Sequence, residues 1–168
     1  MPVTIRDAGA GDEAVIAEML AEAATWDRPF GQPLPRLEEI LAEPRVADYV
    51  EGWGRAGDGG IIAELLDVPV GACWFRSFTA EHPGYGFLGE DVPGLGLAVR
   101  PDHRGRGIGT RLLRATIGLA RAQGATALGL SVAERNPALR LYRRAGFTEA
   151  GREDGSLTMR LELPEAGS

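Results

Sequence analysis

The chain has 168 residues, a length that suits a single domain with a sizeable core. Its formal net charge of −6 disfavours a nucleic-acid binder. One cysteine excludes an internal disulfide framework, two isolated histidines make a metal site improbable, and no apolar run approaches the ~20 residues of a membrane span, so we expect a cytoplasmic protein with no metal and no membrane association.

The N-terminal third predicts one strand and several helices. A strand is expected at residues 3–6, and a helix at 12–24 with an apolar face. Three prolines make residues 26–35 a loop. Two short helical pieces follow at 37–42 and 46–53, and Pro44 is expected to break the chain between them.

The next segment predicts a hairpin and then a long loop. Strands are expected at 61–66 and 70–78, joined by a turn at 67–69. Residues 79–93 are rich in glycine and irregular, so they read either as a flexible substrate-side loop or as an ordinary surface connection.

The most informative stretch combines a strand, a glycine-rich loop and an amphipathic helix. Residues 95–99 form the strand, residues 104–109 read Arg-Gly-Arg-Gly-Ile-Gly, and residues 110–121 continue as the helix. Glycines let a ligand approach the backbone, and the first N–H groups of a helix lack partners at its positive end. Arg104 and Arg106 add charged donors, so the junction predicts a pyrophosphate site.

Two familiar phosphate loops do not fit this stretch. A Walker loop needs a lysine, and the chain contains none. A dinucleotide fingerprint needs Gly-x-Gly-x-x-Gly, whereas Gly105, Gly107 and Gly109 are spaced Gly-x-Gly-x-Gly.

The C-terminal part completes a mixed sheet. A buried strand is expected at 127–132, then a short helix that begins at Asn136-Pro137 and ends at Ala145-Gly146. Strands at 147–152 and 157–163 form a final hairpin. The fold class is α/β, with a mixed (α+β) sheet of about seven strands and helices on both faces.

Two motifs carry a resemblance to a known family. Residues 104–109 resemble motif A of the GNAT superfamily of N-acetyltransferases, Arg/Gln-x-x-Gly-x-Gly/Ala. Ala138-Leu139-Arg140-Leu141-Tyr142 and Ala145-Gly146-Phe147 resemble its Ala-x-x-Leu-Tyr-x-x-x-Gly-Phe, in the right order and separation. The resemblance implies one GNAT-like three-layer domain over residues 1–168, with an acceptor-side half at 1–93, an acetyl-CoA-binding half at 94–163, and a splayed central parallel strand pair.

The resemblance also implies the donor site. The backbone of Leu97, Ala98 and Val99 would hold the pantetheine arm and thioester, with an N–H near Val99 as an oxyanion donor. Gly96 suggests a bulge or a close approach in the same strand. Diphosphate contacts fall on the loop and the start of its helix: Arg104, Gly105, Arg106, Gly107, Ile108, Gly109 and Thr110.

Three further side chains are expected at the site. Tyr142 would bind near the thioester and protonate the departing thiolate. Asn136 is either a CoA contact or a helix cap, because the family spacing is one residue longer. The family often has a base glutamate at the strand before motif A, and this chain lacks it, so Glu90 is the nominal base, with Asp91, Glu81 or a water chain as alternatives.

The resulting hypothesis is transfer of an acetyl group from acetyl-CoA to a primary amine by direct attack in a ternary complex. The alternative is a non-catalytic acyl-CoA-binding or sensor module. A homodimer is one candidate assembly. Residues 1–99 carry a net charge of −11 and residues 100–168 of +5, which mildly favours a cationic acceptor. Four aromatic residues of the acceptor-side half either meet that acceptor or cover the core: Trp26, Phe30, Tyr49 and Trp53.

Overall fold

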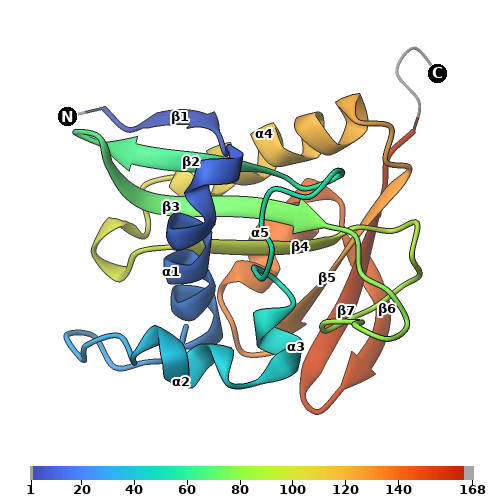
Figure 1. The fold of residues 1–168 in the computed structure, drawn as a ribbon, viewed down its shortest axis with the longest axis horizontal. Coiled ribbons are helices and arrows are strands. Elements are labelled where there is room, and N and C mark those ends of the chain that lie inside the picture. Colours follow the sequence, from blue (N-terminus) through green and yellow to red (C-terminus); the bar gives the residue numbers. More distant parts are fainter. Residues whose placement is uncertain (1, 165–168) are drawn as a thin grey trace.

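The protein was analysed as a computed structural model, which describes residues 2–164. Seven strands form one sheet in the order β1-β2-β3-β4-β5-β7-β6 (Figure 1). The strands are β1 (Thr4–Asp7), β2 (Gly59–Leu65), β3 (Val68–Arg76), β4 (Gly94–Val99), β5 (Ala127–Ala133), β6 (Thr148–Glu153) and β7 (Ser156–Glu162). Every pairing is antiparallel except that of β4 with β5. The expected mixed seven-stranded sheet is therefore confirmed, and it runs through both halves of the chain.

Helices cover both faces of this sheet (Figure 1). They are α1 (Glu13–Ala24), α2 (Leu37–Leu41), α3 (Pro44–Ala47), α4 (Ile108–Ala122) and α5 (Ala138–Ala145). Alternate strand residues serve the two faces: Cys73 and Phe75 pack with α4 and α5, whereas Ala72 and Trp74 pack with α1. None of the helices in residues 2–164 is long and apolar enough to cross a membrane.

The parallel strands β4 and β5 meet only at one end. Gly94 pairs with Gly129, and the Gly129 N–H donates to the Pro93 carbonyl at 2.9 Å. No further β4–β5 pair forms among the described residues, although β4 pairs with β3 along its full length. The two strands thus part beyond Gly94, as the splayed pair requires, and leave one edge of β4 without a strand partner.

Three local expectations were wrong in whole or in part. The β2–β3 turn consists of Leu66 and Asp67, both at positive φ (52° and 64°), so Val68 and Pro69 already belong to β3. The two expected short helices are present as α2 and α3, but α3 starts at Pro44 as its first residue and ends at Ala47, and residues 48–52 form turns instead of helix. Of the two alternatives for Gly96, the bulge is absent and the close approach is present: Gly96 pairs regularly with Trp74, and a Cβ on Gly96 would stand only 2.6 Å from Cζ2 of the Trp74 indole.

Candidate active site

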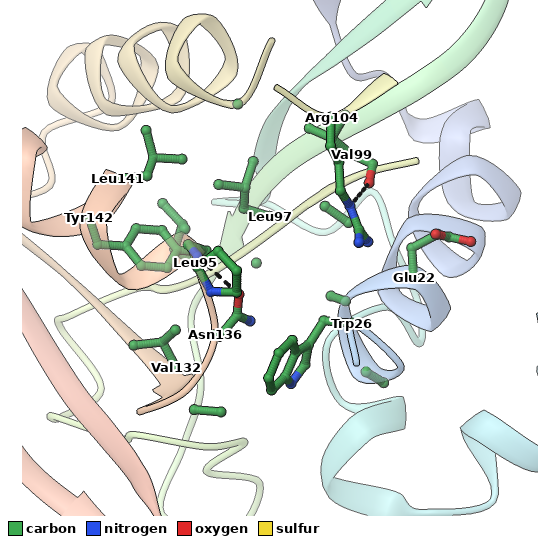
Figure 2. Close-up of a pocket in the computed structure, with 18 of the residues that line it drawn as sticks. Glu22, Trp26, Leu95, Leu97, Val99, Arg104, Val132, Asn136, Leu141 and Tyr142 are labelled. Carbon is green, nitrogen blue, oxygen red and sulfur yellow. Dashed lines mark hydrogen bonds between the residues drawn. The ribbon is translucent and has the colours of Figure 1, made fainter. Parts of the chain in front are cut away.

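A cleft of about 930 Å³ opens where β4 and β5 part. Both halves of the chain line it. In Figure 2, Tyr142 and Leu141 of α5 lie on one side, Glu22 and Trp26 lie on the other, and β4 runs between them. A cavity of this size suits an elongated ligand held along its length.

The glycine-rich loop lines the cleft beyond the C-terminal end of β4. Gly105 and Gly107 both have φ of 78°, and a Cβ built on either would meet nothing within 4 Å. Gly107 is the N-cap residue of α4 and supplies no side-chain cap. Within residues 2–164, no hydrogen bond engages the backbone N–H groups from Gly105 to Thr110. The loop therefore presents open, unpaired donors at a helix N-terminus, where an anion is stabilised.

The two loop arginines behave differently. Arg104 lines the cleft, and its Nε donates to the Val99 carbonyl at 3.0 Å, which fixes the side chain across the end of β4 (Figure 2). Arg106 is exposed and does not line the cleft. Of the residues predicted to bind acetyl-CoA, the following line the cleft: Leu97, Ala98, Val99, Arg104, Gly105, Gly107, Ile108, Gly109, Thr110, Asn136 and Tyr142.

Tyr142 lies in the cleft wall with its ring edge against Phe147, the centroids 5.7 Å apart. The residue is 5% exposed, and among residues 2–164 its hydroxyl has no hydrogen-bond partner. Burial raises the pKa of this hydroxyl, so the phenol stays protonated at neutral pH. A neutral O–H donor is thus available to a ligand in the cleft.

Asn136 has a structural role that the sequence left open. Its Oδ1 accepts a hydrogen bond from the Ala138 backbone N–H at 3.0 Å, which satisfies a donor at the start of α5. The same residue also lines the cleft (Figure 2). This hydrogen bond therefore holds Asn136 in the cleft wall at the start of the helix that carries Tyr142.

Four aromatic side chains form the opposite side, which we call the aromatic wall: Trp26, Tyr49, Trp74 and Tyr85. Two of the expected aromatics are in it and two are not. Phe30 is 84% exposed and lies outside the cleft. Trp53 is buried in the core, where its Nε1 donates to the Gly9 carbonyl.

The long segment 79–93 is fastened to the aromatic wall. The Tyr49 hydroxyl donates to the Tyr85 carbonyl at 3.2 Å and accepts from the Tyr85 N–H at 3.1 Å. Arg45 donates to the Gly84 carbonyl, and its guanidinium lies 4.0 Å from the Tyr85 ring centroid. Burial raises the pKa of Tyr49 to about 12, so both hydrogen bonds persist over the neutral range. These contacts give the loop a defined position at the cleft.

The acidic residues differ from expectation. Glu90, Asp91 and Glu81 are exposed, and none of them lines the cleft. Among the described lining residues the sole carboxylate is Glu22, near the end of α1, and the sole imidazole is His103. Sequence reasoning missed Glu22 because a glutamate on an amphipathic helix usually faces solvent. Its one sequence signal is the position three residues after the core residue Met19.

No group of three or more histidine, cysteine or acidic side chains that could hold a metal ion occurs in residues 2–164. Cys73 is fully buried in β3 beside Thr116, and burial raises the pKa of its thiol to about 12. Among the described residues, the cleft lining offers polar backbone, the phenols of Tyr49, Tyr85 and Tyr142, one imidazole, two arginines and one carboxylate for its chemistry.

The sequence is similar to those of known acetyltransferases. The acetyltransferase (GNAT) family model matches residues 18–147. The chain is 46% identical over 122 residues to streptothricin acetyltransferase of Streptomyces lavendulae, a match that covers 68% of this chain and 64% of that protein. It is 34% identical over 154 residues to L-methionine sulfoximine/L-methionine sulfone acetyltransferase of Pseudomonas aeruginosa, covering 90% of this chain and 83% of that protein.

A solved structure that contains acetyl-CoA has a similar fold. YncA of Salmonella typhimurium, determined with its cofactor acetyl-CoA, superposes with a TM-score of 0.65 at 25% identity, covering 100% of this chain and 98% of that one. The family model spans most of the chain, including the second half of α1, β4, the glycine-rich loop and α5. The parted strands, the open loop and these matches together show that the chain belongs to the GNAT family of acetyltransferases.

Proposed function

We propose that this protein transfers the acetyl group of acetyl-CoA to a primary amine of a small molecule, by direct attack while both are bound. The observation that carries the proposal is the continuity of two open backbone features. The unpaired N–H groups from Gly105 to Thr110 adjoin the free edge of β4, and both line one cleft. A diphosphate and an extended amide-bearing arm are the two parts of acetyl-CoA that such features bind.

In this proposal, backbone groups of the glycine-rich loop and of β4 bind acetyl-CoA, the acetyl donor. The diphosphate binds the loop, Arg104 adds positive charge beside it, and the pantetheine arm lies along the free edge of β4 at Leu97 and Ala98. The thioester then lies near Val99, where a backbone N–H stabilises the oxyanion. Arg106 stands outside the cleft, so it contributes general positive charge and no direct contact.

The reaction balances without a strong acid. The amine nitrogen bonds to the thioester carbon, the C–S bond breaks, the nitrogen gives up one proton and the sulfur takes one. Tyr142 donates a hydrogen bond to the departing sulfur. Burial raises the pKa of the Tyr142 phenol, whereas a free thiol has a pKa of about 8.5, so a lasting transfer of the phenol proton to the thiolate is unfavourable. The phenol therefore regains a proton from the attacking nitrogen as it gives its own to the sulfur, and acts as a proton relay.

The amine enters from the aromatic wall. An ammonium acceptor must first lose one proton to become a neutral nucleophile. Glu90 lies outside the cleft, so we assign this first proton to water and not to that carboxylate; the second proton, lost as the amide forms, is the one that Tyr142 relays to the sulfur. The named relatives support a small-molecule acceptor: one is named for streptothricin and the other for L-methionine sulfoximine. The two names refer to different classes of small molecule, so they do not identify the acceptor of this protein.

The proposal is tested by release of free CoA thiol from acetyl-CoA in the presence of a panel of primary amines. We expect release above the no-amine background for at least one small-molecule amine, with N-acetylated product of the matching mass. Tight acetyl-CoA binding without amine-dependent release across the whole panel would contradict catalysis and favour a binding module.

A further inference from the structure

The two faces of the sheet contribute different parts of the cleft. Tyr142 and Val132 belong to the core cluster that contains α4 and α5, whereas Tyr49 and Trp74 belong to the cluster that contains α1. In the proposed function, the glycine-rich loop and Tyr142 serve the acetyl donor on the first of these faces. The aromatic wall, on the second face, is left for the acceptor.

The acceptor side of the cleft has an apolar lining. Nine described residues of the acceptor-side half, 1–93, line the cleft, and eight of them are alanine, leucine, valine, tryptophan or tyrosine. The ninth is Glu22, which pairs with Arg28 at 3.1 Å, and in Figure 2 its carboxylate points away from Trp26. The net negative charge of residues 1–99 is therefore not presented to a ligand in the cleft.

The arginines around this side are also engaged. Three ion pairs hold them: Arg28 with Glu22, Arg45 with Glu153, and Arg100 with Glu18. None of these three arginines lines the cleft. The basic side chains that do line it, Arg104, Arg144 and His103, belong to the acetyl-CoA-binding half at 94–163. A charged group placed on the aromatic wall would lose solvation without gaining a partner of its own, which is costly.

The polar atoms of two wall residues are used inside the wall. The Tyr49 hydroxyl exchanges two hydrogen bonds with the Tyr85 backbone, and Trp74 Nε1 donates to the Tyr49 carbonyl at 3.2 Å. Tyr49 and Trp74 therefore offer hydrocarbon surface to a ligand. Trp26 follows α1, is partly exposed, and projects its indole into the cleft (Figure 2).

The segment that carries Tyr85 is held against β5 as well as against Tyr49. A Cβ built on Gly86 would lie 2.9 Å from the Leu130 carbonyl oxygen, so the segment touches the strand backbone at this point. The aromatic wall is thus formed before a ligand arrives. A preformed apolar surface binds an apolar group without an ordering cost, and aromatic side chains add specific ring contacts to the burial.

We propose that the acceptor is a hydrophobic primary amine, whose chain ends in an uncharged, ring-sized apolar group that packs on the aromatic wall against Trp26 and Tyr85. This inference rests on the proposed function, because it names the acceptor class of the same site. Trp26 acts here as a specificity residue and takes no part in proton transfer.

The first test uses the unmodified protein, acetyl-CoA and four amines that share one four-carbon chain. The far end of the chain carries a phenyl ring in 4-phenylbutylamine, hydrogen in n-butylamine, a guanidinium in agmatine and a carboxylate in 5-aminopentanoate. We expect kcat/KM for 4-phenylbutylamine to exceed that for each of the others by about tenfold or more, the gain from burying one ring on an apolar surface. Equal or better use of any of the other three would overturn the inference and leave the transfer function intact.

The second test compares two aromatic residues of the same loop. Trp26→Ala is expected to raise KM for 4-phenylbutylamine about tenfold, and to reduce the preference for this amine over n-butylamine by the same factor. Phe30→Ala is the matched control, since Phe30 is 84% exposed and lies outside the cleft, and it should keep the preference of the unmodified protein. An equal loss for both amines in Trp26→Ala would mean that Trp26 only supports the fold, which contradicts the proposal.

Acetyl-CoA titration of each variant separates the acceptor assignment from the transfer function. If acetyl-CoA binds and no amine reacts, catalysis fails and the acceptor assignment fails with it. If amines react but 4-phenylbutylamine has no advantage over n-butylamine, the acceptor assignment alone is wrong.

Discussion

At the scale of single residues, Tyr142 carries the clearest catalytic expectation. Its hydroxyl is neutral, lies in the cleft wall and makes no hydrogen bond within the described chain. We expect Tyr142→Phe to lower kcat by about a hundredfold, the lower range for a lost proton-transfer group. The ring remains packed on Phe147, so acetyl-CoA affinity should be unchanged. Steady-state kinetics combined with titration calorimetry measures both, and an undiminished kcat would remove Tyr142 from the mechanism.

Single residues also mark where sequence reasoning reached its limit. The loop glycines were predictable because their spacing reports a backbone conformation, and Gly105 and Gly107 do adopt positive φ. Glu22 was not predictable, because its burial depends on Arg28 and on the loop beyond α1. Glu90 was placed at the site by proximity along the chain to β4, yet none of residues 90–93 lines the cleft.

At the scale of elements, the β2–β3 hairpin contains a correctable strain. Leu66 and Asp67 occupy left-handed conformations that cost a non-glycine residue about 1 kcal/mol or more. Leu66 is 68% exposed, so its side chain contributes little packing. Replacing the pair by Asn-Gly (Leu66→Asn with Asp67→Gly) should raise the free energy of unfolding by about 1 kcal/mol. Chemical denaturation measures this, and a destabilised variant would contradict the assigned turn.

The elements themselves were largely predictable from periodicity and breakers. Helix α4 and strands β4 and β5 appear within one or two residues of their expected bounds, because their apolar spacing is regular. The hairpin turn was wrong because Pro69 was read as a turn residue, whereas β3 accommodates it beside an irregularity at Ala63 and Glu64. The fit of Trp74 against Gly96 involves two strands and could not be seen in either one alone.

At the scale of the whole molecule, burial of ionisable groups sets the response to alkaline pH. The folded protein raises the pKa of Cys73 from 9.0 to about 12 and that of Tyr49 from 10.0 to about 12. Both groups are neutral when folded and ionised when unfolded between these values. Stability is therefore fully present below pH 9 and is lost as pH rises, by about 1.4 kcal/mol per pH unit for each group.

This pH response can be assigned to one residue. We expect the free energy of unfolding to fall between pH 8 and pH 11, and to fall less steeply in Cys73→Ala than in the unmodified protein. Urea titrations at fixed pH values give the two curves. Parallel curves would show that Cys73 ionises equally in both states, contrary to its complete burial.

The central claim is that the backbone donors from Gly105 to Thr110 hold acetyl-CoA, and calorimetric titration of two glycine variants tests it most directly. Gly107 and Gly124 both have positive φ and open space where a Cβ would stand, at opposite ends of α4, so aspartate strains the backbone similarly at each. We predict that Gly107→Asp weakens acetyl-CoA binding by about a hundredfold or more, because a carboxylate then faces the diphosphate. Gly124→Asp should bind like the unmodified protein. Unchanged affinity in Gly107→Asp would contradict the account.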